Sequence, residues 1–501
     1  LEANFEQRLN DEIANLQPEW TEFKNDVTSQ LAQKANQSDV DNVSSQMNKL
    51  ERELSLVGSV NYGTITLPND FKHDLTFDLW RDVDGMIKHN YNVDREIIPD
   101  ITYYVHENGN PNNDGLSKDT PLNAIEFAID KIEENPNIQS AKIVILSEYL
   151  TRNRTSVVKT ITKNIVIEPE MGVETVLGTF ERRLSWETYE NIYKTQVPTS
   201  PSNIVVFDRK FRGEFNLPKK YEKVNSIQEC IDNAGTYHVN GNSYIYVHRL
   251  DGSAIDNEEV YVCLNQVIFD ITVDNNATLV IKDLTLLNAR LTDSFKINGT
   301  DGTSGKFVGQ NIKLYSSGFG EDNGFRFNNL KSVWMFDCLV LDVGADGFNY
   351  HTNNNNINNP SFAFEYNCSA FNCGVNSEHG TRNCTTAHDG MHILRINSKG
   401  DTSKGPVLAD VNGCYSINYD CVMNNSLLTS NNYQNAAFCF DDSPWQGNSN
   451  PDGKAILINC SGGDNNTYGI NCDESFKAPG KITISNFKGK NIPDDIQFKT
   501  I

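Results

Sequence analysis

The densest group of residues able to transfer protons or hold an anion lies between Thr386 and Arg395. His388, Asp389 and His392 fall within five positions, and Arg395 follows three residues later. Imidazole and carboxylate groups act as general acids and bases, and a guanidinium binds a carboxylate or an acetyl oxygen. We therefore expect His388, Asp389 and His392 to be catalytic and Arg395 to bind substrate. A hydrogen-bonded surface histidine is the alternative for each imidazole.

A second carboxylate in a similar sequence context is Asp346. The segments 346–350 and 389–393 both begin with Asp-Gly and continue with alternating apolar residues. If they are equivalent strands of neighbouring repeats, Asp346 and Asp389 stand on adjacent rungs, about 4.8 Å apart. Carboxylates ~5 Å apart suit a retaining glycosidase, and carboxylates ~6.5–9.5 Å apart an inverting one. The alternative is that each Asp-Gly is only a turn.

Further candidates lie in the loops around these segments. Asp441 and Asp442 precede Trp445, an aromatic ring able to stack on a sugar, and His351 opens an asparagine-rich loop. We add Asp441 to the catalytic candidates as an acid or base. The predicted substrate-binding residues are His351, Arg395, Trp445, Arg326, Glu378 and Asp442.

The sequence contains no cofactor motif that we can assign. It has no H-E-x-x-H, phosphate-binding loop or dinucleotide fingerprint. Asp114-Gly115 lacks the regular oxygen ligands and closing glutamate of a calcium loop, which favours a plain turn. No metal ligands are predicted, and a divalent cation such as calcium is left open as a cofactor.

The elements that position these residues repeat along the last 200 residues. Similar five-residue segments recur every 25–30 residues, with two intervals that carry an insertion of roughly 20. A period of 20–50 residues is typical of solenoids, whose units bury their apolar faces only by stacking. The third residues of the segments, predicted to form one interior column, are Ile312, Cys338, Cys368, Cys414, Cys460 and Phe487.

A second set of segments follows the first and carries the candidate site. These segments begin at Asn323, Asp346, Asp389 and Tyr468, each followed by Gly, and their alternate apolar residues point inward with a period of two. The residues between them face outward, which predicts neighbouring ladders on one exposed face. We expect the functional groove on the face that bears Asp346, His351, Asp389, His392 and Asp441.

The cysteines fit this architecture as small hydrophobic residues. There are 11 of them, with no C-x-x-C pair, and four fall in the predicted interior column. Free buried cysteine packs as a small apolar residue, and thiols stay reduced in a cytosol. We predict that Cys338, Cys368, Cys414 and Cys460 are buried, unpaired and stacked.

The first 57 residues carry a different pattern. Apolar residues are spaced alternately by three and four between Leu9 and Val27 and again between Val40 and Val57. That average of 3.5 residues keeps one seam facing a partner helix. We predict a coiled-coil stalk at 1–57 that makes the protein an oligomer, and an irregular connector at 58–101; a lone surface helix is the alternative.

The start of the next region resembles a known superfamily. A strand at Tyr103–Val105, an Asn/Asp/Gly-rich turn, and the motifs Thr120-Pro121 and Ala124-Ile125 with Ala128-Ile129 resemble the opening of pectate-lyase-like right-handed parallel β-helix proteins. The resemblance implies an all-β fold: a right-handed parallel β-helix over 102–501, closed by a capping helix near 121–132 and preceded by the coiled-coil stalk.

The order of stalk and β-helix resembles bacteriophage tailspike and neck-appendage proteins. That resemblance implies a homotrimer in the virion tail, made in the host cytoplasm and acting at the host cell surface. Its implied partners are a host cell-surface glycopolymer and, through the N-terminal region, other phage tail or baseplate proteins. Three functions stay open: a glycoside hydrolase acting as depolymerase, a polysaccharide lyase, and a non-catalytic receptor-binding spike for wall teichoic acid or capsule.

Charge and hydropathy exclude other classes of function. The chain carries 66 acidic against 43 basic residues, a net charge of -23. Such a surface repels phosphate backbones, so we predict no nucleic-acid partner. No apolar stretch reaches the ~18 residues of a membrane-spanning helix, so we also predict no membrane partner.

Overall fold

The computed structural model describes residues 63–500 except 152–155, 182–183, 198–202, 242–243, 290–291, 317, 319, 355, 357, 378–380, 429–433, 443–452, 464–466, 495 and 497. The stalk predicted for 1–57 lies outside the described residues. The chain divides into two compact units, one made of 1–69 with 75–92 and the other of 70–74 with 93–501. In the first unit, β1 (Leu79–Arg81) and β2 (Ile87–His89) form an antiparallel hairpin.

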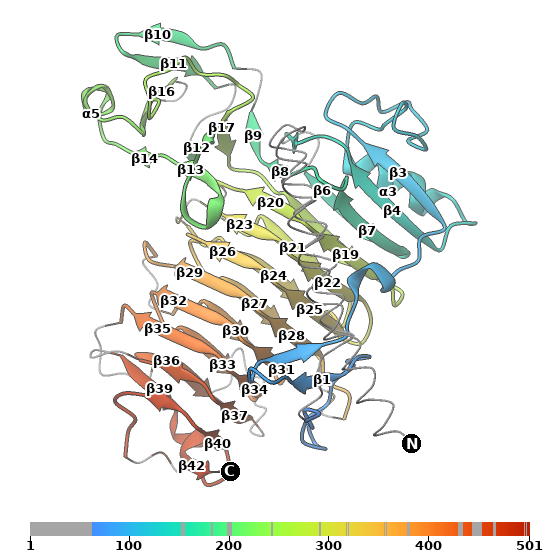
Figure 1. The fold of residues 1–501 in the computed structure, drawn as a ribbon, viewed down its shortest axis with the longest axis vertical. Coiled ribbons are helices and arrows are strands. Elements are labelled where there is room, and N and C mark those ends of the chain that lie inside the picture. The colour runs from blue at the N-terminus through green and yellow to red at the C-terminus, as the bar shows by residue number, and fades with distance from the viewer. Residues whose placement is uncertain are drawn as a thin grey trace, which may run out of the picture. The chain divides into compact units, whose positions relative to one another are not determined.

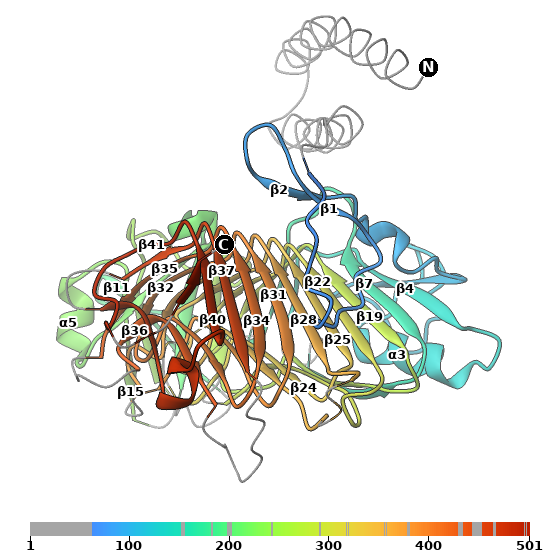
Figure 2. The ribbon, with the colours of Figure 1, turned by 90° about the horizontal axis from the view of Figure 1, so that it is seen from below.

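The second unit is built on three long sheets, in which strands from successive repeats pair in parallel (Figure 1, Figure 2). The twelve-stranded sheet contains β3 (Ile101–Val105), β4 (Ser140–Ile145), β7 (Asn164–Pro169), β19 (Thr278–Lys282), β22 (Lys306–Gln310), β25 (Ser332–Phe336), β28 (Phe362–Tyr366), β31 (His392–Ile396), β34 (Tyr415–Tyr419), β37 (Lys454–Ile458), β40 (Ile482–Ser485) and β42 (Phe498–Thr500).

The nine-stranded sheet contains β6 (Val157–Ile161), β18 (Phe269–Val273), β21 (Phe295–Asn298), β24 (Phe325–Asn328), β27 (Phe348–His351), β30 (Thr385–Ala387), β33 (Leu408–Val411), β36 (Ala436–Asp441) and β39 (Tyr468–Cys472). The ten-stranded sheet contains β5 (Tyr149–Leu150), β8 (Thr175–Gly178), β20 (Leu284–Leu287), β23 (Lys313–Tyr315), β26 (Leu339–Leu341), β29 (Ser369–Cys373), β32 (Lys399–Ser403), β35 (Val422–Ser426), β38 (Ser461–Gly462) and β41 (Lys488–Gly489).

Each repeat is one coil that visits the three sheets in turn, as β24, β25 and β26 do. The inward side chains of all coils form one continuous apolar core, which contains Phe325, Val333 and Val340 from these three strands. Three parallel sheets wrapped around one core are the arrangement of a parallel β-helix. The all-β prediction is therefore confirmed, and the topology agrees with the right-handed form expected for parallel crossovers.

A left-handed residue ends every strand of the twelve-stranded sheet from β22 to β40. These residues have φ between 50° and 54° and are Asn311, Asp337, Asn367, Asn397, Asp420, Asn459 and Asn486. Asn and Asp tolerate this conformation better than other non-glycine residues. They also stack: the side-chain amide of Asn397 donates to the Oδ1 atom of Asn367, and that of Asn367 to Asp337.

The interior column predicted from sequence is correct in part. Ile312, Cys338, Cys368, Cys460 and Phe487 each follow one of these left-handed residues. Cys414 does not: it precedes β34, and its predicted place is taken by Cys421. One whole coil was also missed, because its column residue is Ser398, a polar residue inside the core.

The prediction that the cysteines are buried and unpaired is confirmed, whereas Cys414 does not stack in the predicted column. All eleven are unpaired and buried. Burial, followed by the neighbouring Cys338 thiol, raises the pKa of the Cys368 thiol well above its ordinary value. The thiol therefore stays protonated, and it packs as an apolar group.

The N-terminal end of the β-helix carries the helix α3 (Ile125–Glu134), close to the capping helix expected near 121–132. Its first residues, Ile125, Ala128 and Ile129, are buried in the same core as the inward side chains of β3 and β4. The helix covers apolar side chains that an open coil end would expose to water.

Residues 180–264 depart from the uniform β-helix predicted over 102–501. They form an inserted subdomain of two antiparallel-rich sheets, joined to the β-helix between β8 and β18 (Figure 1). Its elements are β9 (Phe180–Glu181), β10 (Glu187–Tyr189), β11 (Ile192–Gln196), β12 (Ile204–Arg212), η2 (Glu214–Asn216), β13 (Pro218–Lys220), β14 (Glu222–Lys223), α5 (Ile227–Asp232), β15 (Thr236–Asn240), β16 (Tyr244–His248) and β17 (Val260–Leu264).

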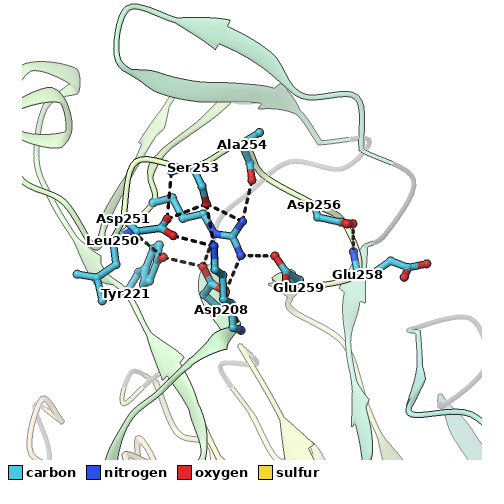
Figure 3. Close-up of polar contacts among 11 residues, drawn as sticks. Asp208, Tyr221, Leu250, Asp251, Ser253, Ala254, Asp256, Glu258 and Glu259 are labelled. Atoms are coloured by element: carbon cyan, nitrogen blue, oxygen red, sulfur yellow. Dashed lines mark hydrogen bonds and ion pairs between the residues drawn. The ribbon is translucent and has the colours of Figure 1, made fainter. Parts of the chain in front are cut away.

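A buried ion pair organises the inserted subdomain (Figure 3). The Arg249 guanidinium, 2% exposed, donates through Nε to Oδ2 of Asp208 at 2.9 Å. It also donates to the Ala254 carbonyl at 2.7 Å, and the Tyr221 hydroxyl donates to the same Asp208 oxygen at 2.7 Å. A buried pair persists only when further hydrogen bonds satisfy both groups. This one ties β12 to the loop after β16, and we assign it a structural role.

Replacing Cys368 by Asp places an unpaired carboxylate among apolar interior side chains. We expect the free energy of unfolding to fall by more than about 3 kcal/mol, because a lone buried charge costs far more than a lost thiol. Urea denaturation of the variant measures the loss, with Cys368→Ala, which removes the thiol without adding a charge, as the control. Rapid labelling of Cys338, Cys368 or Cys460 by a thiol reagent in the native protein would contradict the assigned burial.

Candidate functional site

The outer face of the nine-stranded sheet carries two rows of polar side chains. The pairing of the strands determines the two rows. Alternate residues of a strand point outward, and each lies beside the residue that it pairs with on the next strand. Row one is Lys296, Arg326, Asn349 and Thr386, and row two is Asn298, Asn328, His351 and His388. His388 follows β30 directly, and its amide donates to the carbonyl of Tyr350 at 3.0 Å.

Arg326 is held in place by acids and amides at the start of these rows. Its Nη1 donates to Oδ2 of Asp293 at 2.5 Å, and its Nε donates to Oδ1 of Asn328 at 3.2 Å. Asn328 in turn donates to Asn298, and Asn298 to Asp270, each at 2.9 Å. The chain of hydrogen bonds crosses the three coils of β18, β21 and β24 and orients every side chain in it.

His351, His388 and Asp389 form a compact cluster at the end of row two. The two imidazole rings are stacked with centroids 4.0 Å apart. Nδ1 of His351 lies 3.3 Å from Oδ2 of Asp389, and Nε2 of His388 lies 3.0 Å from the Thr386 hydroxyl. Burial first, then His351 and Arg326, lower the pKa of His388 well below 6.5. His388 is therefore neutral at pH 7, and its buried Nδ1 has no hydrogen-bond partner among the described residues.

Asp389 sits in a left-handed turn that leads out of the nine-stranded sheet. Its φ is 65°, and the following Gly390 has a φ of 75°. The side-chain amide of Asn412, on the next coil, donates to Oδ1 of Asp389 at 2.6 Å. With His351 at the other oxygen, the carboxylate is fixed on both sides and still has lone pairs free for a ligand.

Asp442 occupies the same turn position two coils beyond Asp389. Asp389 lies level with Asn412 on the next coil. Val411 pairs with Asp441 on the coil after that, so Asn412 lies level with Asp442. Oδ2 of Asp442 lies 3.2 Å from Nζ of Lys481, while its buried Oδ1 has no hydrogen-bond partner among the described residues. Burial, which outweighs the attraction of Lys481, raises the pKa of Asp442 to about 6.

Asp441 lies on row two itself. It pairs with Val411, the neighbour of His388 on the next coil, and is 8% exposed. Four predicted site residues, Arg326, His351, His388 and Asp389, are therefore brought together, and Asp441 and Asp442 extend the same edge of the sheet.

The predicted adjacency of Asp346 and Asp389 is wrong. Tyr350 pairs with Ala387, so Asp389 is level with Thr352, six positions beyond Asp346. Six residues of strand span about 20 Å, far more than an acid–base pair tolerates. The two Asp-Gly pairs contain glycine for different reasons. At Gly347 a Cβ atom would lie 2.4 Å from the Cys384 carbonyl oxygen, so no side chain fits there. Gly390 adopts the left-handed backbone conformation of a turn.

Asp346 instead lies just before β27, beside Asn349 of row one. Its oxygens accept from the Asn349 side chain at 2.7 Å and from the Asn383 amide at 2.8 Å. Burial raises its pKa above the ordinary value. Asp346 is buried and orients Asn349, which is a positioning role at this site.

His392 does not belong to this face. It begins β31 in the twelve-stranded sheet, on the outer side, where its Nδ1 accepts from the Lys72 amide at 2.8 Å. The strand equivalent to β27 is β30, not the segment that contains His392. The prediction that His392 is catalytic beside Asp389 is therefore corrected.

Arg395 points into the interior and cannot bind an outside ligand. It is 0% exposed, and its Nη1 and Nη2 donate to Asp410 at 2.7 and 2.8 Å. Nε lies 3.5 Å from Oε1 of Glu365, a second interior acid. The alternation of β31 explains the error: Ile393 and Arg395 face inward, so a charged residue stands where the pattern predicts an apolar one.

Two predicted residues, Glu378 and Trp445, lie outside the described residues. The site residues that sequence reasoning did not name are Asp293, Asn328 and Asn412, while Asn349 pairs with Arg326 on the outer face. The alternation of β24 and β27 points to Asn328 and Asn349, since both are polar residues between buried ones. Nothing in the sequence points to Asn412, which acts from another coil.

No group of three or more His, Cys, Asp or Glu side chains within the described part of the chain is arranged to hold a metal ion. A divalent cation stays a prediction without a site. None of the described helices is long and apolar enough to cross a membrane.

Comparison with known proteins gives distant likenesses in structure alone. No protein-family model and no curated sequence matches the chain. A solved structure described as a glycoside hydrolase shares 8% identity with a TM-score of 0.45, over 80% of this chain and 94% of that one. XylC in complex with xylose shares 11% at a TM-score of 0.40, over 80% and 86% of the two chains. Pectate lyase Pel9A shares 11% at 0.35, over 75% and 79%. The assignment of the fold rests on the sheets themselves.

Replacing Arg395 by Met tests the interior assignment. The change leaves Asp410 and Glu365 buried without their cation, so we expect a loss of about 3–5 kcal/mol in the free energy of unfolding. Chemical denaturation measures it. Lys296→Met, on the outer face, is the control and should cost less than about 1 kcal/mol. A stable Arg395→Met protein with weakened ligand binding would favour the original substrate-binding prediction.

Proposed function

We propose that this protein binds a cell-surface polysaccharide along the outer face of the nine-stranded sheet and hydrolyses its glycosidic bonds. The observation that carries the proposal is the pair Asp389 and Asp442, which occupy one turn position two coils apart on either side of Asn412. Two steps of about 4.8 Å place their backbones ~10 Å apart. That is close to the ~6.5–9.5 Å between the carboxyl groups of inverting glycosidases.

Asp442 has the properties of the general acid. Its pKa of about 6 leaves about half of the carboxyl groups protonated at pH 6 and about a tenth at pH 7, far more than for an ordinary aspartate. The buried Oδ1 without a described hydrogen-bond partner suits a carboxyl oxygen that carries a proton. This role replaces the substrate-binding one predicted from the sequence.

Asp389 has the properties of the general base. Asn412 and His351 fix its two oxygens, so the carboxylate is oriented before a substrate arrives. A base aimed at one water molecule needs this preorganisation. The neutral ring of His388, stacked on His351, restricts the movement of His351.

The charges of the two rows favour a neutral polysaccharide. Arg326 is paired with Asp293, and Lys296 lies 3.7 Å from Asp270. Both cations are thus matched by acids, and neither is spare to neutralise a uronate, as a lyase requires. The amides of Asn298, Asn328 and Asn349 offer the hydrogen bonds that sugar hydroxyls use.

The biological setting of the proposal rests on sequence. The 3.5-residue pattern of residues 1–57 and the resemblance to tailspike proteins support a homotrimeric phage tail spike. Its substrate would be a host surface glycopolymer, and its N-terminal region would attach to other tail or baseplate proteins. Acting in the virion tail, such a spike meets the polysaccharide outside the host cell.

A receptor-binding spike without activity is the second candidate. The hydrogen-bonded rows, in which most polar groups already have protein partners, favour it as a rigid recognition surface. The two candidates differ in one respect that an experiment measures: only the hydrolase consumes its ligand.

Asp389→Asn and Asp442→Asn should each reduce cleavage by about 10²–10⁴ while leaving the melting temperature unchanged, because a positioned acid or base is lost. The assay incubates the full chain with a panel of purified capsular and wall polysaccharides and measures new reducing ends. Asp283→Asn, in the left-handed turn after β19 where later coils carry Asn, lies outside the two rows and is the control that should retain activity.

Other outcomes separate the alternatives. Products that absorb in the ultraviolet as unsaturated uronates identify a lyase. Binding of a polysaccharide without any product identifies a receptor-binding spike. Full activity in both variants places the acid and base elsewhere.

The activity should also depend on pH through Asp442. The general acid must be protonated, so kcat/KM should fall as pH rises above about 6, approaching tenfold per unit. A pH–rate profile of the wild-type protein measures this limb. A profile that stays flat between pH 6 and 8 would remove Asp442 from the role of acid.

A further inference from the structure

Residues 70–74 form a short strap on the outer face of the twelve-stranded sheet. Asp74 accepts hydrogen bonds from the Ser332 hydroxyl at 3.0 Å and from the Trp334 indole at 3.1 Å. At the other end, Asp70 binds the Tyr415 hydroxyl at 3.2 Å and Lys454 at 2.5 Å. The strap belongs to the compact unit of the β-helix, while the residues on both sides of it belong to the other unit.

The middle of the strap is held by His392. The Lys72 amide donates to Nδ1 of His392 at 2.8 Å, across a sequence separation of 320 residues. The imidazole packs against the ring of Phe71, at 5.1 Å, and the ring of Tyr415, at 5.3 Å, and these two rings also contact each other. Phe71 is 3% exposed, so its ring is buried between the strap and the sheet, in contact with the imidazole.

We propose that His392 is a pH-sensitive latch, which holds the strap on the sheet while its imidazole is neutral and releases it when the imidazole is protonated. A neutral imidazole can accept one hydrogen bond at Nδ1. Protonation turns Nδ1 into a donor that faces the Lys72 amide, another donor. The hydrogen bond is then lost, and a positive charge stands among aromatic rings.

The groups around His392 set the direction of the response. Burial is the main cause that lowers its pKa to about 4, and the charges of Lys72 and Lys331 act in the same direction. The charge of Asp70 opposes them. The Lys72 amide donates to the neutral ring, so its hydrogen bond favours the neutral form. On the strap, Asp74 and His73 lie nearby; burial lowers the pKa of His73, which adds no charge at neutral pH. The neighbours Phe362 and Tyr415 on β28 and β34 are uncharged at these pH values.

The direction in which pH changes the stability of the closed strap follows from the pKa of His392 in the closed and open states. An open, solvated histidine has a pKa near 6.5, above that of the closed state. The closed strap is therefore fully stable above pH 6.5 and loses stability as pH falls toward 4. Each pH unit changes the ratio of open to closed strap by up to tenfold, about 300-fold over this window.

Hydrogen exchange of the full-length protein tests the latch. The measured quantity is the protection factor of the peptide that spans 70–74, between pH 7 and pH 4, relative to a peptide within β31. We expect protection of the strap to fall as the pH falls, while the β31 peptide stays protected. A strap whose relative protection is independent of pH would overturn the proposal, whatever the variants show.

Two variants isolate the imidazole. His392→Asn and His392→Gln each keep a side-chain oxygen able to accept a hydrogen bond but cannot be protonated, so either should flatten the pH dependence. His238→Asn is the matched control: His238 bonds the Val224 carbonyl at 3.0 Å in the inserted subdomain, away from the strap. It should leave the pH dependence unchanged. A folded His392 variant that keeps the wild-type decline would falsify the assignment of the latch to His392.

Discussion

Parallel pairing places equivalent residues of successive coils about 4.8 Å apart, so each side chain meets the same column on the coils before and after it. The left-handed Asn and Asp residues after β25, β28 and β31 stack in this way, with Asn367 bonded to Asp337 on one side and to Asn397 on the other. The thiols of Cys338 and Cys368 do the same inside. The polar rows of the nine-stranded sheet are the outer counterpart of these columns. Chemistry on this molecule is therefore arranged along columns.

The interior beneath the candidate site breaks the apolar rule. Arg395 pairs with Asp410, and the Thr385 hydroxyl donates to Glu365 at 2.6 Å. Oδ1 of Asp410 also accepts from the Ala387 amide at 3.2 Å, just before His388 and Asp389. Burying this network costs desolvation energy that an apolar core avoids. The hydrogen bonds of this network hold Thr385 and Ala387 of β30 from the interior side. The turn that carries Asp389 therefore begins from a rigid strand.

The columns explain how much could be predicted from the sequence. Where interior residues are apolar, as at Ile312, Cys338 and Cys368, the spacing reveals the coil directly. The coil of Ser398 was missed because its column residue is polar, and Cys414 was placed in the column instead of Cys421; Cys460 and Phe487 are again in register. That single error moved Asp389 and His392 into the wrong strand. The inserted subdomain was not foreseen either, since its short alternating strands carry the same pattern as those of the solenoid.

Column geometry also restricts the distance between an acid and a base. Groups at one position on the coils are separated by multiples of about 4.8 Å. One step gives ~5 Å, the spacing of a retaining glycosidase, and two steps give ~10 Å, near that of an inverting one. Asn412 occupies the intervening step between Asp389 and Asp442, and its amide donates to Asp389. An uncharged residue there keeps two carboxyl groups from being direct neighbours. The number of coils therefore sets the separation of the two acids, and Asn412 keeps the position between them uncharged.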